Sequence, residues 1–255
     1  MIPIKTKKEI DIIREGGKIL AEIMSKLEKM TKVGISTKEL NRVAETLVFK
    51  YKAKPAFKGH ENFPATLCTS LNQVIVHGVP CDYKLKEGDI LSLDLGILYK
   101  GFFTDMSRTL PVGKVTPEIL RLIMVTKEAL KLAIEEAKPG NTFGDVGNRI
   151  QRYVESQGFN VVRELCGHGI GKELHEEPQI LNCGERREGE KIKEGMVFCL
   201  EPMVTVGDWH IKKSKDGFGF ETKDGSLSAH FEHTVAIIED ECKILTLLRG
   251  KPQSR

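Results

Sequence analysis

The chain has 255 residues, 40% of them hydrophobic, which supplies enough apolar surface for one sizeable core, and we expect one compact domain over residues 1–255. Its 39 basic and 36 acidic residues are interspersed and leave a net charge of +3, which argues against specific nucleic-acid binding through a dense basic face. No segment approaches the roughly 18 uninterrupted apolar residues of a membrane span, and no basic and then apolar leader opens the chain, so we expect a cytoplasmic protein.

Capping signals followed by apolar residues at helical spacing predict four amphipathic helices. Three of them start at a Ser or Thr with an acidic side chain three residues later, and the fourth starts at a Thr-Pro pair. The predicted helices run from Thr6 to about Met30, from Ser36 to a point before Pro55, from Thr116 to about Ala137, and from Thr142 to near Gly158.

Matching segments occur in the two halves of the chain. The helix junction at 32–40 matches the one at 138–146 at an offset of 106 residues, and the turn and strand at 86–94 match those at 193–201 at an offset of 107. These matches predict an α+β fold with two pseudo-symmetric halves, a shared curved antiparallel sheet and helices outside.

The halves would span roughly residues 1–112 and 113–255. Each contains a His-Gly pair, and we place His77 at the repeat position that His168 occupies in the other half. Each half also has acidic residues at or near the ends of apolar strands, so the repeat would bring these acids together.

Two of the acids lie in a strand pair predicted around a turn at 99–101. Asp94 stands inside an apolar run, where an unpaired carboxylate is costly to bury. A turn at 99–100 would place Asp94 opposite Asp105, and a turn at 100–101 would make them diagonal neighbours, so either register puts both on one face. Carboxylates in such a place share a proton, pair with cations or bind metal.

The second half supplies two more acids, Glu201 after an apolar strand and Glu232 before a β-branched run. Four carboxylates offset the charge of two divalent cations, and with one imidazole they form the oxygen-rich shell expected for Mn, Fe, Co or Zn. We therefore predict a dinuclear site in which a bridging water or hydroxide attacks a carbonyl polarised by metal.

Three histidines are candidates for this site. His168, between glycines in 166–171, is interpreted as the imidazole ligand, with a turn histidine in a flexible loop as the alternative. His175 is not half of a zincin helix, because Gln179 stands four residues later, and it suits substrate contact. His77 follows an apolar run and is either a core histidine or an active-site residue, and we place it in the active site.

The remaining histidines, His60, His210, His230 and His233, are expected to be structural or exposed, although His230 and His233 flank Glu232 and could support it from behind. The glycines around His168 lack the spacing and the Lys-Ser/Thr ending of a phosphate-binding loop.

Seven motifs occur in order along nearly the whole chain: Asn72–Pro80, Ser92–Asp94, Thr104–Thr109, Cys166–Gly171, His175–Pro178, Glu201–Met203 and Phe231–Thr234. Together they resemble the signatures of the type I methionine aminopeptidases. The resemblance implies the pita-bread fold and removal of the N-terminal methionine from nascent proteins and peptides, with a small second residue preferred. It implies two divalent metal ions, and we include a structural monovalent cation among the expected cofactors.

The resemblance also implies residue roles. The implied metal ligands are Asp94, Asp105, His168, Glu201 and Glu232. Asp105 and Glu232 would bridge the metals, and Glu201 would help to transfer protons. His77 would contact the substrate near the reacting centre, and His175 would hydrogen-bond the scissile amide.

The methionine pocket departs from the commonest pattern of that family. His60 stands where Tyr is frequent, Leu174 where Phe is frequent, and Phe218 where Trp is frequent, while Phe63 and Cys68 are the expected walls. An apolar slot favours methionine by roughly 1.5–3 kcal/mol for full burial, so these exchanges are expected to alter selectivity without abolishing it.

Prolidase and aminopeptidase P resemble this family in fold and metals but carry a substantial N-terminal domain, for which no room is expected before a helix that starts near Thr6. A type II enzyme would carry a helical insertion, and none is apparent. The alternative of another class is a binding protein on an inactive peptidase fold, although all five implied ligands are present.

A ribosome contact is compatible with catalysis, and we expect a monomer. The basic residues that would make this contact, or else form a solvated helix face, are Lys5, Lys7, Lys8 and Arg14.

Overall fold

The computed structural model describes residues 2–248 and contains the four predicted helices, with their ends at the predicted caps. These are α1 (Lys7–Met30), α2 (Thr37–Lys50), α3 (Pro117–Glu136) and α4 (Phe143–Ser156). Thr6, Ser36 and Thr142 each accept a hydrogen bond from the backbone N–H three residues on, and the acidic side chain there bonds back to the cap. Thr116 caps α3 in front of Pro117. The helix predictions are confirmed.

The strands pair antiparallel throughout. They are β1 (Lys54–Pro55), β2 (Cys68–Leu71), β3 (Val74–Val76), β4 (Ile90–Tyr99), β5 (Phe102–Pro111), β6 (Asn160–Val161), β7 (Cys166–Gly169), β8 (Glu176–Leu181), β9 (Val197–Leu200), β10 (Met203–Thr205), β11 (Ile211–Lys213), β12 (Phe220–Thr222), β13 (Ser228–His230), β14 (His233–Ile238) and β15 (Glu241–Ile244), with a short 3₁₀ helix at His60–Asn62. Four sheets result: β1-β4-β2 with β5 on β4, β13-β10-β6, β11-β12-β3, and β15-β14-β9-β7-β8.

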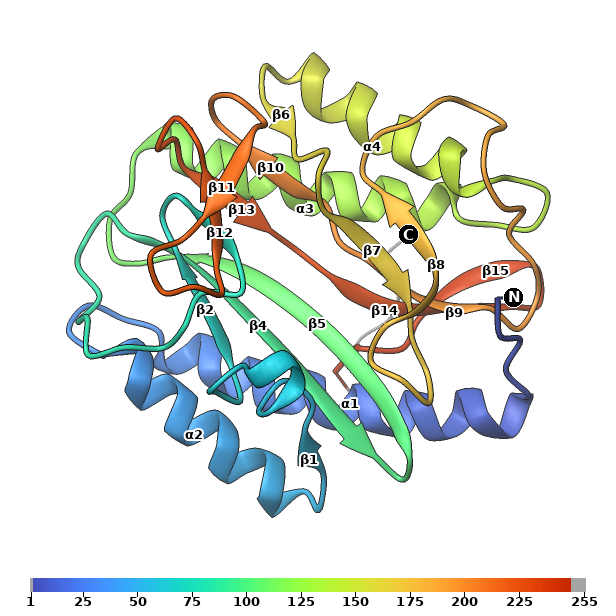
Figure 1. Cartoon of the computed structure of the whole chain (residues 1–255), viewed down its shortest axis with the longest axis horizontal. Helices are drawn as coiled ribbons and strands as arrows, with labels where there is room; N and C mark the ends of the chain where they lie inside the picture. The colour runs from blue at the N-terminus through green and yellow to red at the C-terminus, as the bar shows by residue number, and fades with distance from the viewer. Residues whose placement is uncertain (1, 249–255) are drawn as a thin grey trace.

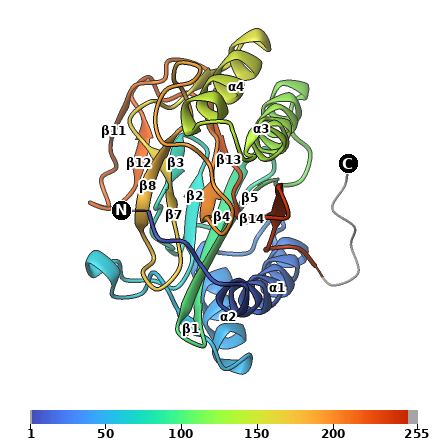
Figure 2. The same ribbon diagram turned by 90° about the vertical axis from the view of Figure 1, so that its right-hand side faces the viewer.

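Helices cover one face of this strand layer. Figure 1 shows α1 and α2 beside β4 and β5, and α3 and α4 at the opposite end of the molecule. In the side view of Figure 2, α1 and α3 lie to the right of the long strands, while β11 and β12 lie to their left. The predicted α+β architecture with helices outside is confirmed.

The first half shows how strand alternation creates this layer. Leu91, Leu93, Leu95 and Ile97 of β4 are fully buried in an apolar cluster with the inner face of α1 and α2. Because side chains alternate along a strand, Asp94 must point to the other face, away from the helices.

Each half contains the same contact between the start of a helix and a later turn. Ser36 pairs with Lys84 as an isolated antiparallel bridge, and Thr142 pairs with Lys191 in the same way, at the offsets of 106 and 107 residues found in the sequence. The same turn ends in a left-handed glycine, with φ of 94° at Gly88 in one half and 80° in the other. The pseudo-symmetry of the fold therefore rests on a repeated cap, bridge and turn.

The proposed equivalence of His77 and His168 is wrong. His168 lies on β7, which pairs with β9, and the counterpart of β9 in the repeat is β4. The strand that pairs with β4 in the place of β7 is β2, whereas His77 follows β3, which pairs with β12. The two His-Gly pairs are thus a coincidence of short sequence and not part of the repeat.

The predicted basic surface at the start of the chain is smaller than expected. Lys5 is buried and forms an ion pair with Glu176, and Arg14 pairs with Asp11 along α1. Lys5 is therefore unavailable to an acidic partner. Within residues 2–248, no helix combines the length and the apolar content that crossing a membrane would need.

Candidate active site

The β4–β5 hairpin places two carboxylates at the centre of the molecule. Tyr99 pairs with Phe102, so the turn lies at residues 100–101, and Asp105 faces Gly96 while Asp94 faces Ser107. The second of the two predicted registers is confirmed, and the acids are diagonal neighbours on one face. Both are buried.

The second half is joined to this hairpin beside the acids. The Glu232 N–H donates to the carbonyl of Ser107 at 3.1 Å, and the Ser107 N–H donates back at 3.4 Å. The Thr234 hydroxyl accepts from the N–H of Asp105 at 2.9 Å and donates to its carbonyl at 2.8 Å. These contacts between residues far apart in sequence fix Glu232 against the aspartates.

β7 aims the imidazole of His168 into the same space. A Cβ at Gly167 would lie 2.4 Å from the carbonyl of Cys199, and one at Gly169 would lie 2.1 Å from that of Glu177, so only glycine permits both neighbouring strands to approach. The ring Nδ1 donates to the Gly169 carbonyl at 2.9 Å, because a carbonyl can only accept. Nε2 of the neutral ring therefore keeps its lone pair for a ligand in the cavity.

Glu201 completes the acidic group directly after β9. Its Oε1 lies 3.6 Å from Nε2 of His168, and its Oε2 lies 3.5 Å from Nε2 of His230. Asn182 donates to the Glu201 backbone carbonyl at 3.0 Å, which orients the segment after the strand.

Burial raises the pKa of all four acids, and repulsion by neighbouring carboxylates adds to the rise for three of them. The pKa of Asp105 rises from its ordinary value of 3.8 to about 7, chiefly through desolvation. The pKa values of Asp94, Glu201 and Glu232 lie well above their ordinary values, first because they are desolvated and then because they repel one another. The protein alone therefore cannot keep all four of these carboxylates ionised.

The chemistry of these atoms fits a divalent cation. Oδ1 of Asp94, Oδ1 of Asp105 and Oε1 of Glu232 are buried and lack a hydrogen-bond partner among the described residues, although buried carboxylate oxygens are normally satisfied. The three carboxylates present ligand atoms within 4.8 Å of one another. A cation bound there would supply the missing partner and the missing positive charge.

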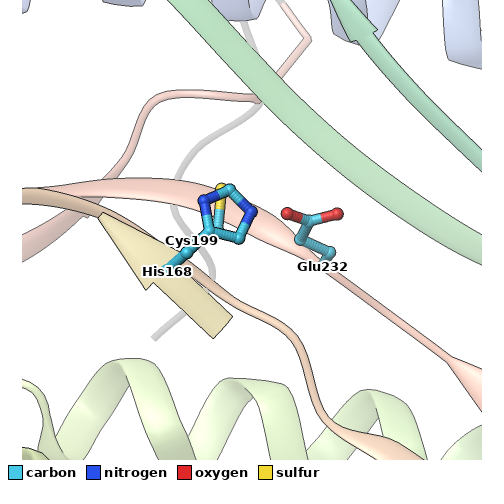
Figure 3. Close-up of side chains that lie close together, drawn as sticks. All are labelled: His168, Cys199 and Glu232. Atoms are coloured by element: carbon cyan, nitrogen blue, oxygen red, sulfur yellow. The ribbon is translucent and has the colours of Figure 1, made fainter. Parts of the chain in front are cut away.

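Cys199 lies beside this group. His168, Cys199 and Glu232 also bring ligand atoms within 4.8 Å of one another, and Figure 3 shows the three side chains projecting into one space from separate segments. The pKa of the Cys199 thiol is raised by desolvation and then by Glu232 and Asp105, so the thiol keeps its proton. Since metals bind the thiolate, the carboxylates and imidazole are the better ligands.

All ten residues singled out in the sequence line one cavity of about 780 Å³. We refer to the four acids and His168 together as its floor. The other five, which form its walls, are Phe63, Cys68, His77, His175 and Phe218.

His77 and His175 stand exposed in the cavity, so the alternative of a core histidine at position 77 is wrong. His77 has a left-handed backbone with φ of 58°, a strained conformation that is common at functional sites. Partial desolvation by the cavity walls lowers the pKa of the His77 ring to about 4, and it lowers the pKa of the His175 ring as well. Both rings are neutral near pH 7, able to donate from one nitrogen and accept at the other.

The apolar side chains of the cavity wall pack against one another. The rings of Phe63 and Phe218 meet edge to face with centroids 5.6 Å apart. Leu174 is buried beside them, and the ring of His60 lies 5.3 Å from that of His175. His60, expected to be structural or exposed, is in fact exposed at the mouth of the cavity.

Two side chains next to the acids, those of Cys199 and His230, were not among the predicted ligands or catalytic residues. Alternation along β9 places Cys199 on the same face as Glu201, so its position could have been found from the strand period. His230 is fully buried, and neither ring nitrogen has a hydrogen-bond partner in the described part of the chain. Its expected support of Glu232 differs from what the structure shows, since its nearest carboxylate is that of Glu201.

Comparisons with known proteins agree with this site. Residues 11–239 match the model of metallopeptidase family M24. The methionine aminopeptidase of Clostridium perfringens is 45% identical over 249 residues, covering 98% of this chain and 100% of that protein. The crystal structure of methionine aminopeptidase from Rickettsia prowazekii has a TM-score of 0.95 at 40% identity, covering 97% of this chain and 100% of that one.

Prolidase is the more distant relative. The prolidase from Pyrococcus furiosus has a TM-score of 0.79 at 28% identity, and the match covers 96% of this chain but 66% of the prolidase. Identity, structural similarity and coverage all favour the predicted resemblance over the proline-specific alternative. The chain belongs to metallopeptidase family M24 and, within that family, to the methionine aminopeptidases.

Proposed function

We propose that the carboxylate floor of the cavity holds two divalent metal ions with which the chain hydrolyses the peptide bond after an N-terminal methionine. The observation that carries this proposal is the set of buried, unpartnered oxygens on Asp94, Asp105 and Glu232 beside the free Nε2 of His168. The chain is a metal-dependent aminopeptidase by family, and this is the part of its cavity that suits metal.

The residues that would hold the two ions are Asp94, Asp105, His168, Glu201 and Glu232. Metal bound there would supply Lewis acidity toward the scissile carbonyl and would make water a nucleophile at neutral pH. The oxygen-rich, nitrogen-poor set suits Mn, Fe, Co or Zn, and their availability decides which ion is used.

The protein's own residues orient the substrate and move protons. His77 and His175 are neutral and lie over the floor, where they can hydrogen-bond the scissile amide and the group that develops charge. Glu201 lies between His168 and His230 with a raised pKa, a suitable place to hold a proton and pass it to the leaving amine.

The apolar walls are proposed to bind the methionine side chain. Phe63 and Phe218 offer ring edges and faces, and Cys68 is a buried thiol whose pKa is raised by desolvation and then by Asp94. The rings of His60 and His175, whose centroids lie 5.3 Å apart, line the same cavity and would favour a small second residue.

Release of the N-terminal residue from peptides beginning Met-Gly, Ala-Gly and Met-Pro tests the proposal. The protein is stripped of metal, and Mn, Co, Fe or Zn is restored separately. We expect cleavage of the Met-Gly peptide but not of the Ala-Gly peptide, and only with metal. Cleavage that requires proline in the second position would favour a prolidase-like activity, and no cleavage with any ion would favour a binding protein.

A structural monovalent cation is proposed at the junction of the halves. The Ser228 hydroxyl lies 3.1 Å from the carbonyls of both Asn72 and Val74, so three oxygens converge there. Potassium or sodium should raise the melting temperature of the protein, and Ser228→Ala should remove that effect.

We further propose a cytoplasmic monomer that acts on nascent chains at the ribosome, because its substrates arise there. Lys7 and Lys8 remain exposed on the first turn of α1 and are the candidate contact. Unchanged ribosome co-sedimentation after Lys7→Glu and Lys8→Glu would exclude this surface, and sedimentation of the free protein tests the monomer.

A further inference from the structure

A buried ion pair lies behind the loop that carries His175. Lys5, in the segment before α1, is 7% exposed, and its ammonium pairs with the carboxylate of Glu176. The two residues are 171 positions apart in sequence, so the pair ties the start of the chain to the second half. Both views place the start of the described chain beside β8 (Figure 1, Figure 2).

Glu176 uses its second oxygen to hold the loop. Its Oε1 accepts from the backbone N–H of Lys172 at 2.7 Å and from that of Glu173 at 3.2 Å. One carboxylate therefore fastens the loop backbone and is itself neutralised by Lys5. Charge-assisted bonds of this kind are the stronger class of hydrogen bond.

The surroundings leave little freedom for this pair to rearrange. A Cβ at Gly171 would lie 2.6 Å from Cε of Lys5 and 2.8 Å from Oε1 of Glu176. The carbonyl of Gly171 accepts from the N–H of Phe103 at 2.7 Å, and the N–H of Lys5 donates to the carbonyl of Gly195 at 2.8 Å. The loop is thus packed between β5 and the segment before α1.

The imidazole of His175 depends on this loop for its position. Its ring centroid lies 4.5 Å from that of His168 and 5.3 Å from that of His60. Among the described residues, no hydrogen bond holds the His175 ring itself. The backbone of its neighbour Glu176 and of the residues before it is what sets where the ring stands.

We propose that Lys5 is a positioning residue for His175, acting through Glu176 and the loop at 171–175. Its ammonium pairs with the buried Glu176 carboxylate, and that carboxylate fixes the loop from which His175 reaches the reacting centre. This inference rests on the proposed role of His175. Lys5 itself does not touch the substrate.

Removal of the ammonium by Lys5→Met tests the proposal. Removing one partner of a buried ion pair leaves an uncompensated charge, which is strongly unfavourable. The Glu176 carboxylate should therefore recruit water or rotate away from the loop. We expect kcat for a Met-Gly peptide to fall by about tenfold or more with KM within about twofold, because small misplacements of reacting groups are costly. Lys5→Arg should restore most of the rate.

Lys172→Met is the matched control. This lysine lies on the same loop, but its side chain is 73% exposed and only approaches Glu9 at 3.7 Å. It should leave kcat unchanged. Melting temperature and metal content, measured on each variant, report whether folding or metal loading has changed.

A double-mutant cycle with His175→Ala separates positioning from general stability. If Lys5 acts through His175, Lys5→Met changes kcat by less than about twofold once His175 is absent. An equal loss in both backgrounds, or no loss in a folded Lys5→Met protein, would overturn the inference. If Lys5→Met does not fold, Glu176→Gln, which keeps an acceptor for the loop without the charge, enters the same cycle.

The single variant His175→Ala distinguishes this inference from the proposed function. A large loss in His175→Ala with no coupling to Lys5 overturns the inference alone. An unchanged kcat in His175→Ala refutes the proposed role of His175, and the inference then falls with it.

Discussion

The floor of the cavity and its rim, by which we mean the walls and the mouth around His60, are built in different ways. On the floor, Asp94, Asp105 and Glu232 are at most 6% exposed and lie on or beside strands locked together by backbone hydrogen bonds between the two halves. At the rim, His60 and Glu61 are exposed on a 3₁₀ turn, and Glu61 has a left-handed φ of 46°. The floor is rigid and shared by both halves, whereas the rim is local.

This difference separates reaction class from substrate choice. The floor can be altered only by changing charge in a buried network, which affects metal and chemistry together. The rim can be altered one side chain at a time, because its loops lie at the surface. Substitutions on the floor should therefore abolish the reaction, and substitutions at the rim should change KM or selectivity.

The largest effect is expected from Asp105→Asn. This change removes the charge of a carboxylate that we propose as a metal ligand, so activity on a Met-Gly peptide should fall by at least about a thousandfold. Metal content after dialysis should fall with it. Activity assays and elemental analysis on the same sample check both results.

Asp89→Asn is the matched control for this experiment. Asp89 is equally buried in the first half but lies in the turn before β4, where it accepts from Asn72, Tyr83 and the Lys86 N–H. Asp89→Asn should lower the free energy of unfolding and leave the metal content unchanged. Comparable metal loss in both variants would show that the floor is not distinct from other buried acids.

The second effect concerns pH and stability in metal-stripped protein. Folding raises the pKa of Asp105 from 3.8 to about 7, so the folded state binds its proton more tightly. The stability that this group contributes is present below about pH 4 and is lost as pH rises through 7. Relative to wild type, Asp105→Asn should therefore gain a few kcal/mol of unfolding free energy between pH 4 and pH 8.

Denaturant titrations of both proteins at several pH values measure this difference. Added metal should reduce this difference at pH 8, because a bound cation offsets the charge of the buried Asp105 carboxylate. A difference that is independent of pH would mean that Asp105 ionises in the folded protein as readily as in water.

The third effect, at the rim, is smaller. Phe218→Ala removes one wall of the apolar slot, so KM for a Met-Gly peptide should rise by roughly tenfold, while kcat stays within about twofold. Phe49→Ala provides the comparison, since Phe49 is 57% exposed on α2 and does not line the cavity. A loss of kcat in Phe218→Ala would show that the rim contributes to chemistry.

The smallest effect tests the repeat outside the site. Ser36→Ala and Thr142→Ala remove equivalent capping boxes, and each should lower the free energy of unfolding by about 1 kcal/mol. The losses should add, because the caps lie in different halves and share no partner. Thr46→Ala, in the interior of α2, should cost less, and activity should stay unchanged in all three.

Much of the fold and floor could be predicted because the signals are local. A cap needs four residues, and a strand face needs only alternation, so α1 and the shared face of Asp94 and Asp105 follow from short segments. The sequence alone did not decide between a turn at residues 99–100 and one at residues 100–101. The structure settles it with left-handed φ values of 49° at Lys100 and 85° at Gly101, a pattern that the glycine favours.

The rest depends on contacts between distant segments. The burial of Lys5 follows from Glu176, and no local pattern predicts that pair. His77 seemed equivalent to His168 on two letters of sequence, but strand pairing decides equivalence. The rim likewise depends on β3 pairing with β12, a contact that only the folded chain shows.

Crystals of the metal-stripped protein soaked in Mn²⁺ provide the most direct test of the proposed site, because anomalous scattering locates the ion without reference to activity. We predict two adjacent peaks on the floor, bound by carboxylate oxygens of Asp94, Asp105, Glu201 and Glu232 and by Nε2 of His168. Manganese at other sites only, or a floor that stays empty in protein that cleaves the Met-Gly peptide, would contradict the proposed metal site.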